Sequence, residues 1–183
     1  TVDSFSTSIL GNLNDWSQAS CRQRQEVVNV VHQRFAELLD SPKLSSFQAA
    51  DRCFEIATFR HRPTKLNLHL IPGGTFERGS NTTPWAFDKP VQLVTVDPFL
   101  IGESPVIQSV WDGIGGEDNR CWHGEQRPIE KVTVVQVKAW LKKASGGLHL
   151  PSEAEWEYAC RSGASTDYFW GQEFDERYVW CKD

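Results

Sequence analysis

The sequence predicts an α+β domain preceded by a helical hairpin. Apolar residues recur at spacings of three and four in the first third of the chain, a period typical of amphipathic helices. Beyond residue 63 the period changes to two, which indicates half-buried strands. Two later segments open on capping boxes, which mark helix starts. Eight tryptophans and ten phenylalanines among 183 residues can organise a core in a chain of this length.

Residues 1–62 are predicted to form the hairpin and its linker. A first helix is expected over about 17–40, because its apolar residues lie on one stripe and Asp40-Ser41-Pro42 stops it. The stripe consists of Val27, Val28, Val31, Phe35, Leu38 and Leu39. A second helix is expected over about 45–59, with Phe47 and Phe54 on its apolar face. This pair is too small to fold alone, so we expect it to dock on residues 63–183.

Short strands and loops are predicted after the junction at Arg60–Pro63. Leu66, Leu68 and Leu70 alternate with polar residues, which indicates a strand. A turn at 72–74 leads to a second strand at 75–79, and 91–101 is strand-like with a break at Asp97-Pro98. The glycine-rich residues 112–128 are expected to form a long irregular loop.

Two helices are predicted near the end of the chain, over 133–144 and 152–162. Thr133 with Gln136 and Ser152 with Glu155 both fit a capping box, in which the hydroxyl and the longer side chain satisfy each other's backbone amides. Val134 is expected on the inner face of the first helix. Cys160 is expected in the core, on the apolar side of the second helix.

Charge and composition exclude several classes of protein. The net charge is −5, so no basic excess is present to meet nucleic-acid phosphates. The sequence contains no run of 18 apolar residues, so it predicts no membrane-spanning helix. Five cysteines contain no closely spaced pair, which favours free, mostly buried thiols in a reducing compartment. Together with the absence of a signal-peptide pattern, this predicts a cytoplasmic location.

The sequence motifs identify no catalytic or metal-binding residue. The histidines are scattered and form no ligand pair of helical spacing. The glycines at 113, 115 and 116 lack the Lys-Ser/Thr of a phosphate-binding loop. Glu153, Glu155 and Glu157 are interpreted as acids that oppose the positive end of a helix.

Four segments carry a resemblance to a known family. They are 70–79 (LIPGGTFERG), 98–111 (PFLIGESPVIQSVW), 127–133 (RPIEKVT) and 148–161 (LHLPSEAEWEYACR) followed by 168–171 (YFWG). In this order and spacing they resemble the formylglycine-generating enzyme family, also called the sulfatase-modifying factor family. The resemblance implies a C-type-lectin-like fold. Residues 63–183 would be the N-terminal part of that domain, completed by a missing or separate C-terminal segment.

The resemblance implies several chemistries, but it assigns none to a residue of this chain. Enzymes of the family oxidise a substrate cysteine with oxygen and copper, related proteins use non-haem iron, and others only bind ligands. Their working residues would lie after Asp183, and Cys160 and Cys181 do not match catalytic positions. The resemblance also implies that enzymes of the family often hold calcium through an asparagine near the equivalent of Tyr178–Trp180, but this stretch reads Tyr-Val-Trp-Cys and contains no carboxamide. Copper, iron or calcium therefore belongs, if anywhere, to the complete domain.

Two hypotheses of function follow. The first is a non-catalytic binding or accessory module that recognises a protein or small-molecule ligand, with Trp170, Tyr178 and Trp180 as binding residues. The second is part of a formylglycine-generating-type oxidase or non-haem iron relative, with catalytic residues C-terminal to Asp183. A carbohydrate lectin is a third alternative that lacks a Glu-Pro-Asn-type calcium motif.

The chain is also expected to be one piece of a cut or split domain. It begins at Thr1 and contains no methionine, and its last aromatic residues need something to pack against. The expected partner is therefore the C-terminal remainder of the same domain or a separate chain.

Overall fold

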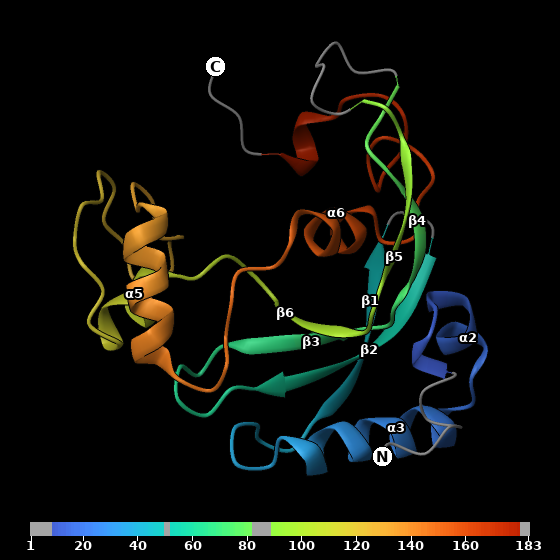
Figure 1. Ribbon diagram of the computed structural model, residues 1–183, viewed down its shortest axis with the longest axis horizontal. Helices are drawn as coiled ribbons and strands as arrows, with labels where there is room; N and C mark the ends of the chain where they lie inside the picture. The colour runs from blue at the N-terminus through green and yellow to red at the C-terminus, as the bar shows by residue number, and fades with distance from the viewer. Residues whose placement is uncertain (1–8, 50–51, 82–88, 180–183) are drawn as a thin grey trace.

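The computed structural model describes residues 9–49, 52–81 and 89–179, and Figure 1 shows its arrangement. Helices α2 (Leu13–Gln18) and α3 (Cys21–Arg34) come first. Six strands follow: β1 (Lys43–Ala49), β2 (Arg52–Arg60), β3 (Asn67–Ile71), β4 (Gly74–Arg78), β5 (Gln92–Val96) and β6 (Phe99–Gly102). The later elements are α4 (Gln108–Gly113), α5 (Val134–Ala144), α6 (Glu153–Arg161) and the short 3-10 helix η2 (Glu176–Tyr178). This mixture of helix and sheet confirms the α+β class.

The strands in the described part of the chain form two antiparallel sheets. The larger has the order β1-β2-β3-β6, and the smaller pairs β4 with β5. The predicted strands at 66–70 and 75–79 and the break at Asp97-Pro98 are confirmed, because β3, β4 and the division between β5 and β6 fall at these places. None of the helices described is long and apolar enough to cross a membrane.

The second helix predicted over 45–59 is wrong, because this segment forms the β1–β2 hairpin. Phe47 lies opposite Phe54, and Ser45 lies opposite Ile56. Aromatic and β-branched side chains fit such a pleated surface well. β2 also pairs with β3, with Thr58 opposite His69. The sheet therefore continues across the junction at Arg60–Pro63, where the sequence suggested a change of unit.

The first predicted helix is divided into two shorter helices. Ser20 starts α3 with a capping box to Gln23, and α3 ends at Arg34 rather than near residue 40. Phe35, expected on the apolar stripe, is the C-cap residue and is exposed. Val27, Val28 and Leu39 of the predicted stripe are buried, so the expected docking of this region on the rest of the chain is confirmed.

The larger core lies between the N-terminal helices and one face of the sheet. In Figure 1, α3 runs along one side of strands β2 and β3. Ala57 and Phe59 of β2 and Leu68 and Leu70 of β3 lie in this core, each pair two residues apart as the alternation of a strand requires. The indole of Trp16 is buried and donates to the Glu55 carbonyl at 2.7 Å, which joins α2 to the outer part of β2. The buried members are Ile9, Leu10, Trp16, Val27, Val28, Leu39, Ala57, Phe59, Leu68 and Leu70.

A second, smaller core holds α5 against the irregular segment around α4. The rings of Trp111 and Trp140 stack with centroids 5.4 Å apart and planes 9° from parallel. The Trp140 indole donates to the Trp111 carbonyl at 3.0 Å, and the Trp111 indole donates to the Glu117 carbonyl at 2.9 Å. The indole N–H of each buried tryptophan therefore has a hydrogen-bond acceptor, as is usual for buried tryptophans.

The capping boxes of α5 and α6 are present as predicted. The buried residue of α6 is Tyr158, whose hydroxyl donates to the Gly73 carbonyl at 2.8 Å and whose ring meets Phe76 edge-on. Cys160, two residues further along the helix, therefore faces away from this contact and is exposed, so its predicted core position is wrong. Val134 is also exposed, because α5 begins there and buries Trp140 and Ala144 instead.

The prediction about the thiols is right in one respect and wrong in another. The four cysteines described, Cys21, Cys53, Cys121 and Cys160, are free, but all four are exposed rather than buried. Cys181 lies outside the described residues.

The paired glycines after α5 provide a test of close packing. Gly146 and Gly147 both have a φ of 73°, which is strained for any residue with a Cβ. An added Cβ at Gly146 would lie 2.4 Å from His61 Nε2, whereas nothing lies within 4 Å at Gly147. We expect Gly147→Ala to cost about 1 kcal/mol of unfolding free energy. Gly146→Ala should cost about 1–3 kcal/mol more, because the buried ring must move.

Urea unfolding of the two variants measures this difference, and Gly147→Ala serves as the matched control. Equal losses of stability would show that His61 does not pack against Gly146 as the structure places it.

Burial of His61 predicts a pH dependence of stability. His61 is 1% exposed, its Nδ1 contacts Thr64 Oγ1 at 2.8 Å, and its Nε2 has no partner among the residues described. Burial lowers the pKa of His61 below its ordinary value of 6.5. The unfolded chain therefore binds the proton first, so unfolding free energy should fall as pH drops below about 6.5.

Denaturant titrations between about pH 7.5 and 5.5 check this dependence, a range in which most carboxylates stay ionised. His61→Gln should lower stability at neutral pH and reduce the pH dependence, while His69, whose pKa burial also lowers, keeps part of it. An unaltered slope in His61→Gln would contradict the assignment.

Candidate functional site

The segment after α6 is held in place by one arginine. The Arg161 guanidinium donates to the Glu157 carboxylate at 2.7 and 2.9 Å, to the Thr166 carbonyl at 2.9 Å and to the Gly79 carbonyl at 2.8 Å. Its side chain is 12% exposed. Arg161 therefore joins α6, the end of β4 and the start of the C-terminal segment at one point.

An aromatic stack follows this attachment. Tyr168 and Gly171 form an isolated bridge with hydrogen bonds of 3.1 and 3.2 Å, which makes a tight turn around Phe169 and Trp170. The ring of Trp170 lies between Tyr168, at a centroid distance of 4.7 Å, and Tyr178, at 4.9 Å. Both pairs are within 16° of parallel. Phe169 meets Trp170 and Tyr178 edge-on, a favourable geometry for aromatic rings.

A short 3-10 turn brings Tyr178 back onto the stack. Asp175 caps η2 by accepting the Arg177 amide at 3.0 Å, and its carboxylate also pairs with the Arg177 guanidinium. Hydrogen bonding from this arginine lowers the pKa of Asp175, and the carboxylate in turn raises the pKa of Arg177. The two charges therefore largely neutralise each other.

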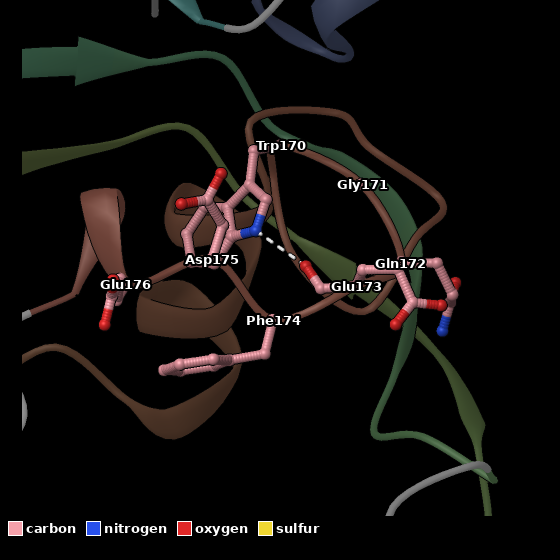
Figure 2. Close-up of a pocket in the computed structure, with 7 residues that line it drawn as sticks. All are labelled: Trp170, Gly171, Gln172, Glu173, Phe174, Asp175 and Glu176. Atoms are coloured by element: carbon pink, nitrogen blue, oxygen red, sulfur yellow. Dashed lines mark hydrogen bonds between the residues drawn. The ribbon is translucent and has the colours of Figure 1, made fainter.

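Beside the stack lies an open hollow of about 570 Å³, formed by residues 170–176. Figure 2 shows Trp170 and Phe174 as its aromatic residues, with the carboxylates of Glu173, Asp175 and Glu176 around them. The Trp170 indole donates to the Glu173 carbonyl at 3.0 Å, which fixes the ring. Phe174 is 58% exposed and Tyr178 is 47% exposed. The hollow thus combines accessible rings with negative charge.

A second hollow of about 730 Å³ lies between α2, β4 and α6, and shares Gln172 with the first. Phe54, Phe76 and Tyr158 provide its apolar part, and Asn12, Ser17 and Arg161 are among its polar groups. The Arg161 guanidinium is already committed to the contacts above, so this hollow offers no free cation at that position.

The described residues do not bring together three side chains able to hold a metal ion. Near Tyr178, where the family resemblance implies a calcium site, the Asp175 carboxylate is paired with the Arg177 guanidinium. Among the described residues, this donor set does not fit copper, iron or calcium.

Two of the three predicted binding residues are brought together by the structure. Trp170 and Tyr178 stack directly, whereas Trp180 lies outside the described residues. Sequence reasoning missed Tyr168 and Phe174 as parts of the same surface. The aromatic run YFWG at 168–171 was a visible signal for Tyr168, but nothing in the sequence pattern marked Phe174.

These features define a mixed α+β domain whose C-terminal part carries an aromatic surface. A family model described as "Sulfatase-modifying factor enzyme 1-like domain" matches residues 55–182. Because this match covers well over half of the chain, the chain belongs to that family. The family prediction made from the four sequence segments is therefore confirmed.

The chain is also similar to several curated proteins over part of their length. It is 26% identical over 140 residues to chaperone protein LppX of Paenibacillus barcinonensis, covering 56% of this chain and 48% of that protein. It is 28% identical over 147 residues to hercynine oxygenase of Mycolicibacterium smegmatis, with coverages of 56% and 34%. It is 34% identical over 87 residues to the formylglycine-generating enzyme of Mus musculus, with coverages of 47% and 22%.

The chain thus spans about half the length, or less, of these relatives. No solved structure matches it. The α+β class is established by the elements of Figure 1, while the C-type-lectin-like fold stays a prediction.

The role of Arg161 predicts how the segment after α6 responds to its removal. Arg161→Met keeps much of the side-chain volume but removes the guanidinium that donates to two carbonyls and to the Glu157 carboxylate, which keeps only the Gly79 amide at 2.8 Å as a donor among the residues described. We expect a loss of about 2 kcal/mol in unfolding free energy. Amide hydrogen exchange should become faster in residues 163–171 and stay unchanged in α3 and β2.

Arg177→Met is the matched control, because it removes an arginine whose side chain is 78% exposed. It should change stability by less than about 0.5 kcal/mol. Equal exchange in both variants would contradict an anchoring role for Arg161.

Proposed function

We propose that this chain is a binding module of the sulfatase-modifying factor family, and that it recognises a basic, apolar segment of a protein partner. The recognition surface consists of Tyr168, Trp170, Phe174 and Tyr178 with the hollow at 170–176. The exposed ring of Phe174 next to the ordered stack is the observation that carries this proposal. Trp180, which lies outside the described residues, remains a predicted contact residue.

The aromatic rings suit this role because they present a large contact area that is already ordered. Tryptophan and tyrosine contribute strongly to binding when they lie at the centre of an interface. Trp170 is held on both faces by tyrosines and at its edge by the Glu173 carbonyl. Little side-chain entropy would therefore be lost when a partner covers it.

The charge around the hollow favours a basic partner. Glu173 and Glu176 place two carboxylates at its border, and the nearby Asp175–Arg177 pair adds little net charge. The whole chain carries a net charge of −5. Lysine or arginine side chains of the partner would gain from the carboxylates and from the exposed ring of Phe174.

The module is proposed to use a C-type-lectin-like scaffold that the remainder of the family domain completes, on the same polypeptide or on a separate one. The short span relative to LppX and hercynine oxygenase supports this. A cytoplasmic location is proposed from cysteine usage. Co-expression with the C-terminal part of the domain should give a complex in which Trp170 and Tyr178 are shielded.

The second candidate function is part of an oxidase. Two relatives are named hercynine oxygenase and formylglycine-generating enzyme, which favours an oxygen-dependent reaction in the complete domain. The catalytic residues would then lie C-terminal to Asp183. The amino-acid sequence encoded after Asp183 distinguishes these candidate functions. Two cysteines in an Arg/Gly-rich stretch favour the copper oxidase, and histidines with a carboxylate favour an iron enzyme. If neither pattern is present, the binding module is favoured.

Calorimetric titration with two matched peptides tests the binding function. One peptide alternates lysine with phenylalanine, and the other alternates glutamate with phenylalanine. We expect only the lysine peptide to bind, and Phe174→Ala to weaken it about tenfold, which corresponds to about 1.4 kcal/mol. Replacing Glu173 and Glu176 by glutamine should weaken binding and reduce its dependence on salt.

Trp122→Ala is the control, since Trp122 is 69% exposed in the loop before α5. This variant should bind the lysine peptide as the parent does. Equal binding of both peptides, or an equal loss in Trp122→Ala, would be evidence against the aromatic surface as the recognition site.

A further inference from the structure

The hollow between α2, β4 and α6 runs along one edge of β4. Four consecutive residues of this strand, from Gly74 to Glu77, line the hollow, and no residue of β5 does. Successive side chains of a strand point to opposite faces, so a hollow that touches all four residues follows the edge of the strand rather than one face. β5 pairs with the other edge of β4. The hollow of about 730 Å³ therefore borders the edge that no strand covers in the sheets described.

The backbone groups of β4 at this edge are open. In an antiparallel pair, every second residue exchanges hydrogen bonds with the partner strand, and the groups of the residues between point the other way. Both ends of the strand are bound, since the Gly73 amide donates to the Leu10 carbonyl at 2.7 Å and Arg161 donates to the Gly79 carbonyl at 2.8 Å. Between them, the N–H and C=O groups of residues 74–78 have no partner outside the β4–β5 pair among the residues described.

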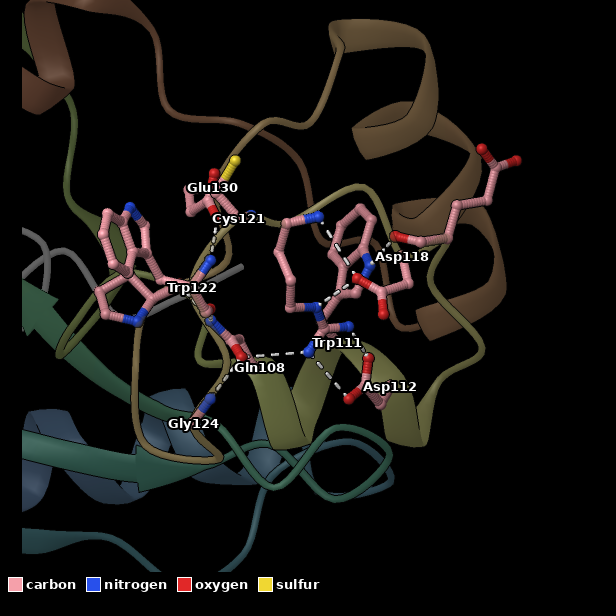
Figure 3. A network of polar contacts seen from close by, with 11 residues as sticks. Gln108, Trp111, Asp112, Asp118, Cys121, Trp122, Gly124 and Glu130 are labelled. Atoms are coloured by element: carbon pink, nitrogen blue, oxygen red, sulfur yellow. Dashed lines mark hydrogen bonds and ion pairs between the residues drawn. The ribbon is translucent and has the colours of Figure 1, made fainter.

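The loop between α4 and α5 shows the opposite situation. Gln108 is 2% exposed, its amide nitrogen donates to the Trp122 carbonyl at 2.7 Å, and its amide oxygen accepts the Gly124 amide at 3.0 Å. Figure 3 shows Gln108 next to Trp122 and Gly124 within this network. Gln108 therefore finds its partners within the chain, whereas the open groups of β4 fit a partner whose own backbone groups repeat at the spacing of a strand.

The free edge of β4 is recessed. An edge strand that is fully open to solvent is a site of uncontrolled pairing with other chains. Here α2 and the segment after α6 form the rest of the hollow beside the strand. A volume of this size is typical of a binding cleft, and a single extended chain enters it more readily than the edge of a whole sheet does.

Rings and a carboxylate define the side chains that this groove accepts. Phe54 and Phe76 are half-buried and line the hollow, and the Phe76 ring meets Tyr158 of α6 at a centroid distance of 5.3 Å. Glu77 is exposed and makes no ion pair among the residues described. Phe76 and Glu77 lie on opposite faces of β4 because they are neighbours in the strand. Since paired strands place their side chains on shared faces, alternating apolar and basic residues would meet the rings on one face and the carboxylate on the other.

We propose that β4 is a docking strand for an extended segment of a partner protein in which apolar and basic residues alternate, and that this segment adds to the sheet along the free edge. In such strand addition the main-chain hydrogen bonds give affinity and the pockets for alternate side chains give specificity. The groove shares only Gln172 with the hollow at 170–176. It is therefore a second site, which does not depend on the function proposed above.

Amide hydrogen exchange of the intact chain, followed residue by residue with NMR, tests the proposal. The probe is a peptide of about eight residues in which lysine alternates with valine. We expect the β4 amides that do not bond to β5 to exchange about tenfold more slowly with the peptide present, because they gain acceptors. Unchanged exchange in β4 would overturn the proposal. Slow exchange without peptide that strengthens with protein concentration would place a second copy of this chain on the edge and would also contradict it.

Two analogues of the peptide separate backbone pairing from side-chain contact. One carries N-methyl groups on its lysines and the other on its valines, which blocks hydrogen bonding along opposite edges of the extended peptide. Only one of the two should slow exchange in β4. An equal effect of both analogues, or no effect of either, would be evidence against strand addition.

Three variants separate this groove from the aromatic surface. At a fixed peptide concentration, Glu77→Gln should reduce the protection of the β4 amides and make it less sensitive to salt. Glu37→Gln, at an exposed position after α3, is the matched control and should change neither. Protection of β4 should persist in Phe174→Ala, which alters the aromatic surface. Its loss in Phe174→Ala would assign the peptide to that surface and sink the β4 site, while the function proposed above would stand.

Discussion

The Arg161 guanidinium is the interaction on which the C-terminal surface depends. Charged groups of low exposure persist when they are paired and hydrogen-bonded. Here one planar group satisfies the Glu157 carboxylate of its own helix and carbonyls of two other segments. This connection gives the segment before the turn at Tyr168–Gly171 a polar link to the end of β4, and so helps to fix the place of the aromatic stack.

In other parts of the chain, too, a buried core holds the helices and strands while the exposed side chains lie on the loops that leave it. The buried residues of β2 and β3 pack under α3, and Trp111 and Trp140 hold α5 to the α4 loop. Accessible side chains then lie on segments that leave these cores, namely Phe174 after α6 and Cys121 after α4. Rigid cores with ordered loops are a common arrangement for binding surfaces.

The fold was predictable from the sequence where the signal was local. Thr133 with Gln136 and Ser152 with Glu155 start their helices as expected, since a capping box involves only residues three apart. The segment 45–59 was misread because its apolar residues fit a helical spacing as well as a strand. The segment is a strand because it pairs with β3, where Thr58 lies opposite His69. His69 lies outside the segment 45–59, so a pattern read within that segment could not reveal the pairing.

The sequence by itself determined the family, the helix starts, the strands of period two and two of the surface aromatics. These depend on short-range order, because a motif or a cap is complete within a few residues. Only the tertiary structure decided that Trp170 lies between Tyr168 and Tyr178, that Cys160 is exposed and that Lys131 meets Cys121. Such contacts depend on how the turns fold back, and the direction of a turn is set by distant partners such as Gly79 for Arg161 and Gln108 for the Cys121 loop.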